Sequence, residues 1–105
     1  MSNLEIYFLN KAESNSEYDW ANLNVDDIRV GKSRCLIKPE LFIIYSIIIF
    51  PEYEGNGYGK LFVEQCKSKY KVIIADKVRF TAIGFWERMG FTDNLDGNWI
   101  YKKEK

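Results

Sequence analysis

Residues 41–70 read LFIIYSIIIF, PEYEGNGYGK and LFVEQCKSKY, and this stretch decides the fold of the chain. Residues 41–50 form an apolar run rich in β-branched side chains, about half as long as a membrane-crossing helix. Such a run is typical of a strand buried on both faces, although the run alone leaves a buried helix open. Pro51 ends the run, because proline cannot donate a hydrogen bond to a sheet ladder.

Three glycines alternate in the next segment, GNGYGK, which covers residues 55–60. Glycine allows positive φ angles and a close approach of the backbone to another molecule. Apolar side chains then recur at helical spacing, at positions 58, 61, 62, 66 and 70. A glycine turn between a strand and a helix N-terminus predicts an anion site, because backbone N–H groups and the positive end of the helix dipole meet there.

Two nucleotide-binding patterns do not fit this turn. The pattern G-x-G-x-x-G requires its third glycine one residue after Gly59. The P-loop pattern G-x-x-x-x-G-K-[ST] requires glycine at the position of Glu54 and a hydroxyl residue at that of Leu61.

Two blocks together resemble the GNAT superfamily of acyl-CoA-dependent N-acetyltransferases. Residues 47–59, IIIFPEYEGNGYG, resemble its motif A, a strand and a proline followed by Arg/Gln-x-x-Gly-x-Gly/Ala at the start of a helix. Residues 82–91, AIGFWERMGF, resemble its later helix, usually written A-x-x-F-Y-E-K-x-G-F. The resemblance implies an α/β (α+β layered) fold: a mixed, mostly antiparallel twisted sheet, with helices packed on it and a splayed parallel strand pair.

The resemblance also implies an activity, the transfer of an acetyl group from acetyl-CoA directly to a primary amine without a metal. The backbone of Ile47, Ile48 and Ile49 would bind the pantetheine arm and the acyl group, where this strand splays from residues 71–75. The pyrophosphate would be bound by the glycine turn, which consists of Gly55, Asn56, Gly57, Tyr58, Gly59 and Lys60.

Three positions depart from the superfamily's pattern. Glu54 replaces the Arg or Gln of motif A, and a carboxylate repels pyrophosphate by about 1 kcal/mol per charge pair in well-solvated surroundings. Arg79 replaces a frequent Asn, and Trp86 replaces a tyrosine that protonates the leaving thiolate in many members. The chain has no histidine, so the general base is unassigned, with Asp76 and Glu40 as the nearest candidates.

Length and composition predict one folded domain over residues 1–105. The resemblance implies that this domain is shortened in the region of the superfamily's N-terminal substrate helices. The net charge of zero counts against a nucleic-acid partner. Residues 1–59 carry five Lys or Arg against nine Asp or Glu, and residues 60–105 carry ten against six. This split fits CoA on the second half and a cationic amine near the first, or solvated faces that differ by chance.

The cysteines Cys35 and Cys66 show no metal or redox spacing, and the N-terminus does not resemble a signal peptide. We therefore expect a cytoplasmic protein without a membrane partner. The acceptor amine stays open between a small molecule, a peptide N-terminus and a lysine, and a homodimer stays open too. Three rivals remain: a non-catalytic acyl-CoA-binding or interaction module, a toxin that acetylates charged tRNA, and a dimerisation module exposing Trp20 and Trp99.

Hydrophobic periodicity and turn residues predict the remaining elements. They are a strand at 4–9, a turn at 14–16, a short helix at 17–23, hairpin strands at 25–30 and 33–37 around Gly31-Lys32, a strand at 70–75, a helix at 82–89, and a last hairpin with strands at 91–92 and 99–103.

Overall fold

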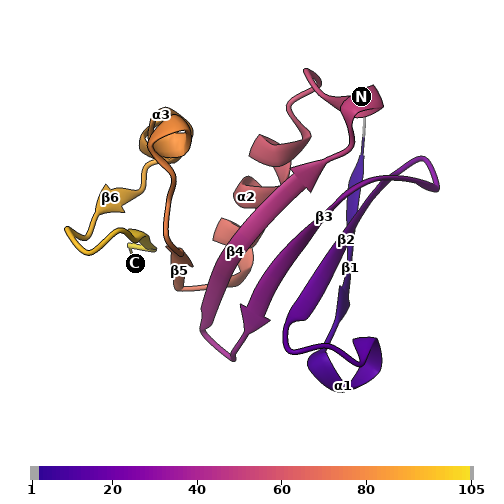
Figure 1. Cartoon of the computed structure of the whole chain (residues 1–105), viewed down its shortest axis with the longest axis horizontal. Helices are drawn as coiled ribbons and strands as arrows, with labels where there is room; N and C mark the ends of the chain where they lie inside the picture. Colours follow the sequence, from indigo (N-terminus) through magenta and orange to yellow (C-terminus); the bar gives the residue numbers. More distant parts are fainter. Residues whose placement is uncertain (1–2, 105) are drawn as a thin grey trace.

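The computed structural model describes residues 3–104, which form one mixed sheet with helices against it (Figure 1). The strand order is β1-β2-β3-β4-β5-β7-β6, and within this sheet only β4 and β5 run parallel. This arrangement confirms the predicted fold class. The strands are β1 (Leu4–Leu9), β2 (Asp19–Val25), β3 (Ile28–Ile37), β4 (Leu41–Ile49), β5 (Val72–Ala75), β6 (Thr92–Asp93) and β7 (Trp99–Lys102), and the helices are α1 (Lys11–Ser14), α2 (Tyr58–Lys69) and α3 (Ile83–Arg88).

The core lies between α2 and the sheet. Phe42 of β4 is fully buried and packs edge-on against Phe62 of α2, with ring centroids 6.2 Å apart. Phe42 also stacks on Tyr70, at 4.8 Å and an interplanar angle of 14°. The structure confirms the predicted strand, glycine turn and helix. The apolar face of α2 packs on the buried face of β4, because each needs an apolar partner.

The sheet divides beside the middle of β4. β5 pairs with β4 only over Leu41–Ile44, and the last bond on that side runs from the Asp76 N–H to the Ile44 carbonyl, at 2.9 Å. Beyond it β4 continues without β5, and α3 follows on the other side of the division (Figure 1). Tyr45 stands at the dividing point as a β-bulge, since Cys35 pairs with Ile44 and Arg34 with Ser46.

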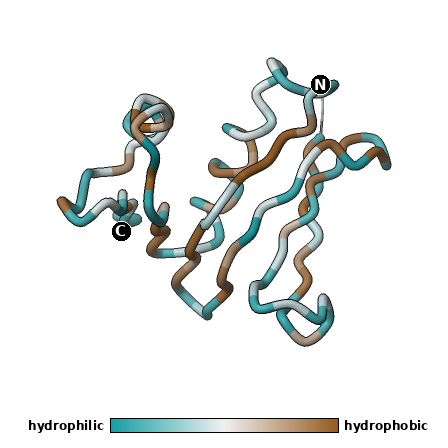
Figure 2. The backbone as a smooth tube through the Cα atoms, viewed as in Figure 1, coloured by the Kyte–Doolittle hydropathy of each residue, from teal (hydrophilic) through white to brown (hydrophobic). Residues whose placement is uncertain are grey.

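The bulge also changes which side chains of β4 face the core. Before it, Phe42 and Ile44 are buried; after it, Ile47 and Ile49 pack on the core and Ile48 is 43% exposed. Figure 2 shows the same interruption, as a pale segment between two hydrophobic stretches of β4. An extra residue in a strand shifts the period-two alternation by one, which explains the change.

The predicted helix at residues 17–23 is wrong, because this segment forms β2 between β1 and β3. Its side chains alternate: Ala21 and Leu23 are fully buried, whereas Trp20 and Asn22 are only partly buried. Alternation over the whole segment favours a strand. The short helix lies earlier, at α1, where Asn10 and Glu13 form a capping box that the sequence reading missed.

The predicted hairpin around Gly31-Lys32 is also wrong. The two-residue turn is at Asp26-Asp27, where both φ angles are positive (52° and 65°), and β3 then runs through Gly31. Gly31 is needed for another reason: a Cβ there would collide with the carbonyl oxygen of Ile48. The glycine permits close approach of β3 to β4 rather than a turn.

A buried carboxylate ties α1 to the end of β3. Asp19 is 4% exposed and accepts hydrogen bonds from the Lys11 N–H (2.8 Å) and the Ile37 N–H (2.7 Å). These two bonds fix the chain around the short connection between β1 and β2, where α1 has four residues.

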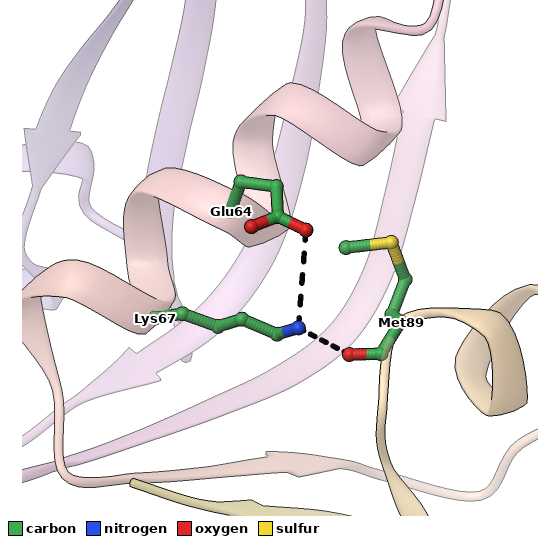
Figure 3. Close-up of polar contacts among 3 residues, drawn as sticks. All are labelled: Glu64, Lys67 and Met89. Carbon is green, nitrogen blue, oxygen red and sulfur yellow. Dashed lines mark hydrogen bonds and ion pairs between the residues drawn. The ribbon is translucent and has the colours of Figure 1, made fainter.

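The C-terminal strands and α3 carry their own aromatic cluster. Trp86 contacts the rings of Phe85 and Phe91, with centroids 5.0 and 4.8 Å away. Lys67 connects this cluster to α2, since its ammonium group donates a hydrogen bond to the Met89 carbonyl (Figure 3). Within residues 3–104, no helix is long and apolar enough to cross a membrane.

Candidate active site

Two adjoining cavities follow the division of the sheet. The first, about 400 Å³, lies on the glycine turn and reaches Ile49 and α3. The second, about 680 Å³, lies between β4 and the segment that joins β5 to α3. Gly59 and Phe85 line both cavities, so the two form one path past the end of α2. We call them the turn cavity and the strand cavity.

The glycine turn leaves the first N–H groups of α2 without a side-chain cap. Gly55 and Gly57 have φ angles of 83° and 76°, which residues with a Cβ rarely adopt, and the N-cap residue Gly57 has no side chain to cap the helix. The Asn56 amide turns back and donates to the Tyr53 carbonyl at 2.9 Å. The 12-residue α2 therefore presents its positive dipole end to the turn cavity.

Three charged side chains line the turn cavity: Glu54, Lys60 and Arg88. Glu54 is one of the residues that line the cavity in which a pyrophosphate would lie. Two cations against one carboxylate leave the cavity with an excess of positive charge. Arg88, which the motif comparison did not single out, comes from the last turn of α3.

The free edge of β4 offers backbone groups to the strand cavity. The Phe50 N–H donates to the Val30 carbonyl at 2.8 Å, so Phe50 turns its backbone polar groups toward β3. Because alternate residues of an antiparallel strand turn to the same side, Ile48 also faces β3, and Ile47 and Ile49 face away from it. No strand of residues 3–104 pairs with β4 on that side beyond Ile44.

Four residues of chemical interest line the strand cavity: Tyr45, Asp76, Arg79 and Trp86. Burial, with the nearby Asp76 carboxylate, raises the pKa of the Tyr45 hydroxyl above its usual value. Arg79 lies here and not at the glycine turn. Glu40 lies at the opposite end of β4, where its carboxylate is 3.3 Å from the Lys71 ammonium.

The sequence reading missed the contribution of the first half of the chain to this cavity. Trp20 of β2 and Lys32 and Arg34 of β3 line it together with β4. Strand pairing places them there, because Lys32 lies opposite Asn22 and Ile48, and Arg34 opposite Trp20 and Ser46. The alternation of residues 19–25 was the available signal. An acidic first half next to the amine is not what the cavity shows, since the first half supplies cations.

No three His, Cys, Asp or Glu side chains gather as a metal site among residues 3–104. Both thiols are buried and lie outside the two cavities. Burial raises the pKa of Cys35 and of Cys66 to about 12, so neither is a thiolate near neutral pH.

Sequence comparison matches residues 2–91 to the model of the acetyltransferase (GNAT) family. An uncharacterized N-acetyltransferase of Oceanobacillus iheyensis is 35% identical over 48 residues, and one of Bacillus licheniformis is 37% identical over 49 residues. The matches cover 46% and 47% of this chain, but only 29% and 30% of those relatives.

Structure comparison finds the same architecture in proteins of low identity. The N-acetyltransferase YlbP of Bacillus subtilis, solved with coenzyme A, has a TM-score of 0.68 at 15% identity, and the match covers 98% of this chain and 97% of that one. A GNAT family acetyltransferase of Elizabethkingia anophelis, solved with acetyl-CoA, has a TM-score of 0.60 at 15% identity, covering 96% and 99%.

Proposed function

The chain belongs to the acetyltransferase (GNAT) family, and we propose that it transfers the acetyl group of acetyl-CoA to a primary amine by direct attack. The observation that carries this proposal is the free edge of β4, which lies between an uncapped helix N-terminus and a cavity with ionisable side chains. Coenzyme A in YlbP and acetyl-CoA in the Elizabethkingia protein support the choice of co-substrate.

In this proposal the turn cavity binds the pyrophosphate. The backbone N–H groups of residues 55–60 and the dipole of α2 attract the anion, and Lys60 and Arg88 add positive charge. Glu54 opposes them and lowers the affinity. The amide-bearing pantetheine arm then runs along β4, where Ile47 and Ile49 offer the free N–H and C=O groups. Ile48, whose backbone faces β3, contributes its position in the strand and no bond to the arm.

The chemical step exchanges one bond for another. The amine nitrogen attacks the thioester carbonyl carbon, an N–C bond forms, the C–S bond breaks, and CoA leaves as the thiolate. The amine must lose one proton and the thiolate must gain one. Holding the two reactants side by side supplies much of the rate, because it removes the entropy cost of their encounter.

The strand cavity holds a candidate for each proton transfer. Asp76 is its carboxylate and accepts the proton of the amine, directly or through a water molecule. Tyr45 is the tyrosine that lines the cavity, and its raised pKa keeps the hydroxyl protonated as a donor for the thiolate. This assignment replaces the tyrosine of the family motif, whose position is occupied by Trp86. Glu40 is excluded as the base by its place at the far end of β4.

Two measurements test the proposal in order. Calorimetric titration with acetyl-CoA should give saturable one-to-one binding, with desulfo-CoA as the non-reactive control. Release of the CoA thiol in the presence of primary amines should then follow with a thiol-reactive dye. No binding at millimolar acetyl-CoA would contradict the cofactor site, and binding without release on any amine would contradict the transfer.

Trp86 favours one second candidate, an acyl-CoA-binding module without transfer. Trp86 is 7% exposed and contacts the rings of Phe85 and Phe91, and its indole cannot act as an acid at neutral pH. This candidate predicts the same titration curve and no thiol release. The two functions therefore separate at the second measurement.

A further inference from the structure

The strand cavity is rich in positive charge. Four cations line it, Lys32, Arg34, Lys77 and Arg79, against the single carboxylate of Asp76. Within the described part of the chain, none of the four makes an ion pair. Cations that face a shared cavity repel one another, so an anion inside it is favoured.

Arg34 is held in place by aromatic contacts, but one of its hydrogen-bond donors has no partner among residues 3–104. Its guanidinium lies over the ring of Tyr18, 4.7 Å from the centroid, and Tyr18 in turn contacts the ring of Tyr45 at 5.2 Å. Its Nε atom is buried and has no hydrogen-bond partner among residues 3–104. A buried donor without a partner is unfavourable, and a ligand oxygen is one way to satisfy it.

Lys32 is placed in a similar way. Its ammonium group lies 5.3 Å from the centroid of the Trp20 ring, and both residues line the strand cavity. Strand β3 turns the side chains of Lys32 and Arg34 to the same face, because residues two apart in a strand share a face. The two cations thus lie beside two aromatic rings on the wall formed by β2 and β3.

We infer that the acceptor is an amine that also carries an anionic group, a carboxylate or a phosphate, which Arg34 and Lys32 bind. This inference rests on the proposed function and names its substrate class. A polycation would be repelled by this wall, and an amine without an anionic group would leave the Arg34 Nε without a partner. The cations also disfavour an ammonium ion in the cavity, which helps the bound amine to lose its proton.

The cofactor's own phosphates are the competing explanation for these cations. The glycine turn and its cations, Lys60 and Arg88, line the other cavity, and Lys32 and Arg34 do not reach it. The positively charged wall therefore lies beyond the acyl end of the path from the turn. Substitution of Arg34 separates the two explanations.

The test uses acetylated products, so it does not depend on turnover. The full chain is saturated with CoA and titrated with N-acetyl-β-alanine, N-acetyl-O-phosphoethanolamine and N-acetylethanolamine, which share a two-carbon arm and differ in charge. Binding is followed by NMR, at the indole N–H of Trp20 and the Nε–H of Arg34. At least one anionic compound should bind ten times more tightly than the neutral one, and the anion that does so identifies the carboxylate or the phosphate.

The Arg34→Gln variant should lose this preference and keep its affinity for acetyl-CoA. Arg29→Gln is the matched control, because Arg29 is an exposed arginine of the same strand outside both cavities. Equal binding of the three compounds, or a preference that survives Arg34→Gln, would overturn the inference. Weaker binding of acetyl-CoA by Arg34→Gln would assign the cations to the cofactor instead. Failure of acetyl-CoA to bind the wild type would overturn the proposed function, which is a separate result.

Discussion

The Lys67 ammonium of α2 donates a hydrogen bond to the Met89 carbonyl at the C-terminal end of α3 (Figure 3). The same nitrogen lies 3.8 Å from a carboxylate oxygen of Glu64 and 4.8 Å from the centroid of the Tyr101 ring. This lysine thereby fixes the position of α3, whose residues form one wall of both cavities.

Replacing this lysine should loosen that wall. We expect Lys67→Met to lower the free energy of unfolding by about 1–2 kcal/mol, because the carbonyl loses a charged donor. Acetyl-CoA binding should weaken as well, since Phe85 and Arg88 of α3 line the turn cavity. Urea unfolding and calorimetry measure the two effects. Lys69→Met is the control: Lys69 lies over the Phe8 ring, away from α3, and should leave binding unchanged.

A negative charge in the glycine turn should oppose the cofactor. Gly57→Glu adds backbone strain of about 1–2 kcal/mol at a positive φ and places a carboxylate beside the predicted pyrophosphate. We expect the Kd for acetyl-CoA to rise by roughly tenfold or more. Gly97→Glu is matched in strain, because Gly97 has φ 93° and open space around it, but it lies in the last hairpin. If both variants bind acetyl-CoA like the wild type, the phosphate assignment is wrong.

Gly31 should tolerate no side chain. A methyl group there would press on the Ile48 carbonyl, and the backbone on both sides belongs to paired strands. We expect Gly31→Ala to cost about 3 kcal/mol or more, which is at the upper end for overpacking. Gly59→Ala, in α2 with nothing within 4 Å, should instead raise stability by about 0.5–1 kcal/mol. Chemical denaturation measures both changes, and equal effects would contradict the close approach of β3 and β4.

The Tyr45 hydroxyl should matter for turnover and not for cofactor affinity. We expect Tyr45→Phe to lower kcat by about 10²-fold, the lower range for loss of a general acid, with an unchanged Kd for acetyl-CoA. Tyr18→Phe is the control, because Tyr18 contacts the Tyr45 ring at 5.2 Å and keeps its own ring in that variant. An unchanged kcat for Tyr45→Phe would leave water as the source of the proton.

The two buried thiols should make stability fall in alkali. Burial raises the pKa of Cys35 and Cys66 from 9.0 to about 12, so each thiol ionises more readily in the unfolded chain. Their contribution to stability is complete below pH 9 and is lost as the pH rises toward 12. Urea unfolding at pH 8 and pH 10.5 should show this loss, and the Cys35→Ala/Cys66→Ala variant should lose less. Tyr70, whose pKa is also raised to about 12, acts in the same direction in both proteins.

The elements that the sequence predicted well are those defined by local signals. The β4 run, the glycine turn and α2 follow one another, and each carries its own pattern of apolar residues or glycines. The hairpin prediction was wrong because Gly31 was interpreted as a turn residue and the Asp26-Asp27 turn carries no glycine. The helix prediction at residues 17–23 was wrong because the alternation of β2 was overlooked. Left-handed aspartates are a weak turn signal in a sequence.

The same contrast between local and distant signals applies to the residues of the candidate site. The glycine turn and the later helix were found from their motifs, and the structure brings them onto one path. Lys32 and Arg34 were not found, because they reach the cavity only through pairing with strands distant in the sequence. Glu40 was a poor candidate for the base for a similar reason: adjacency to β4 in sequence says nothing about which end of the strand is near the cavity.

The bulge at Tyr45 makes the length of β4 as important as its composition. β3 alternates regularly opposite the bulge, so removing Tyr45 or Ser46 would make β4 a regular strand and would leave Ile47 and Ile49 on the core face. Inserting one residue there would instead turn both isoleucines to solvent and their N–H groups toward β3. Each substitution in this strand alters one side chain, whereas a one-residue insertion would alter every later contact of the strand at once.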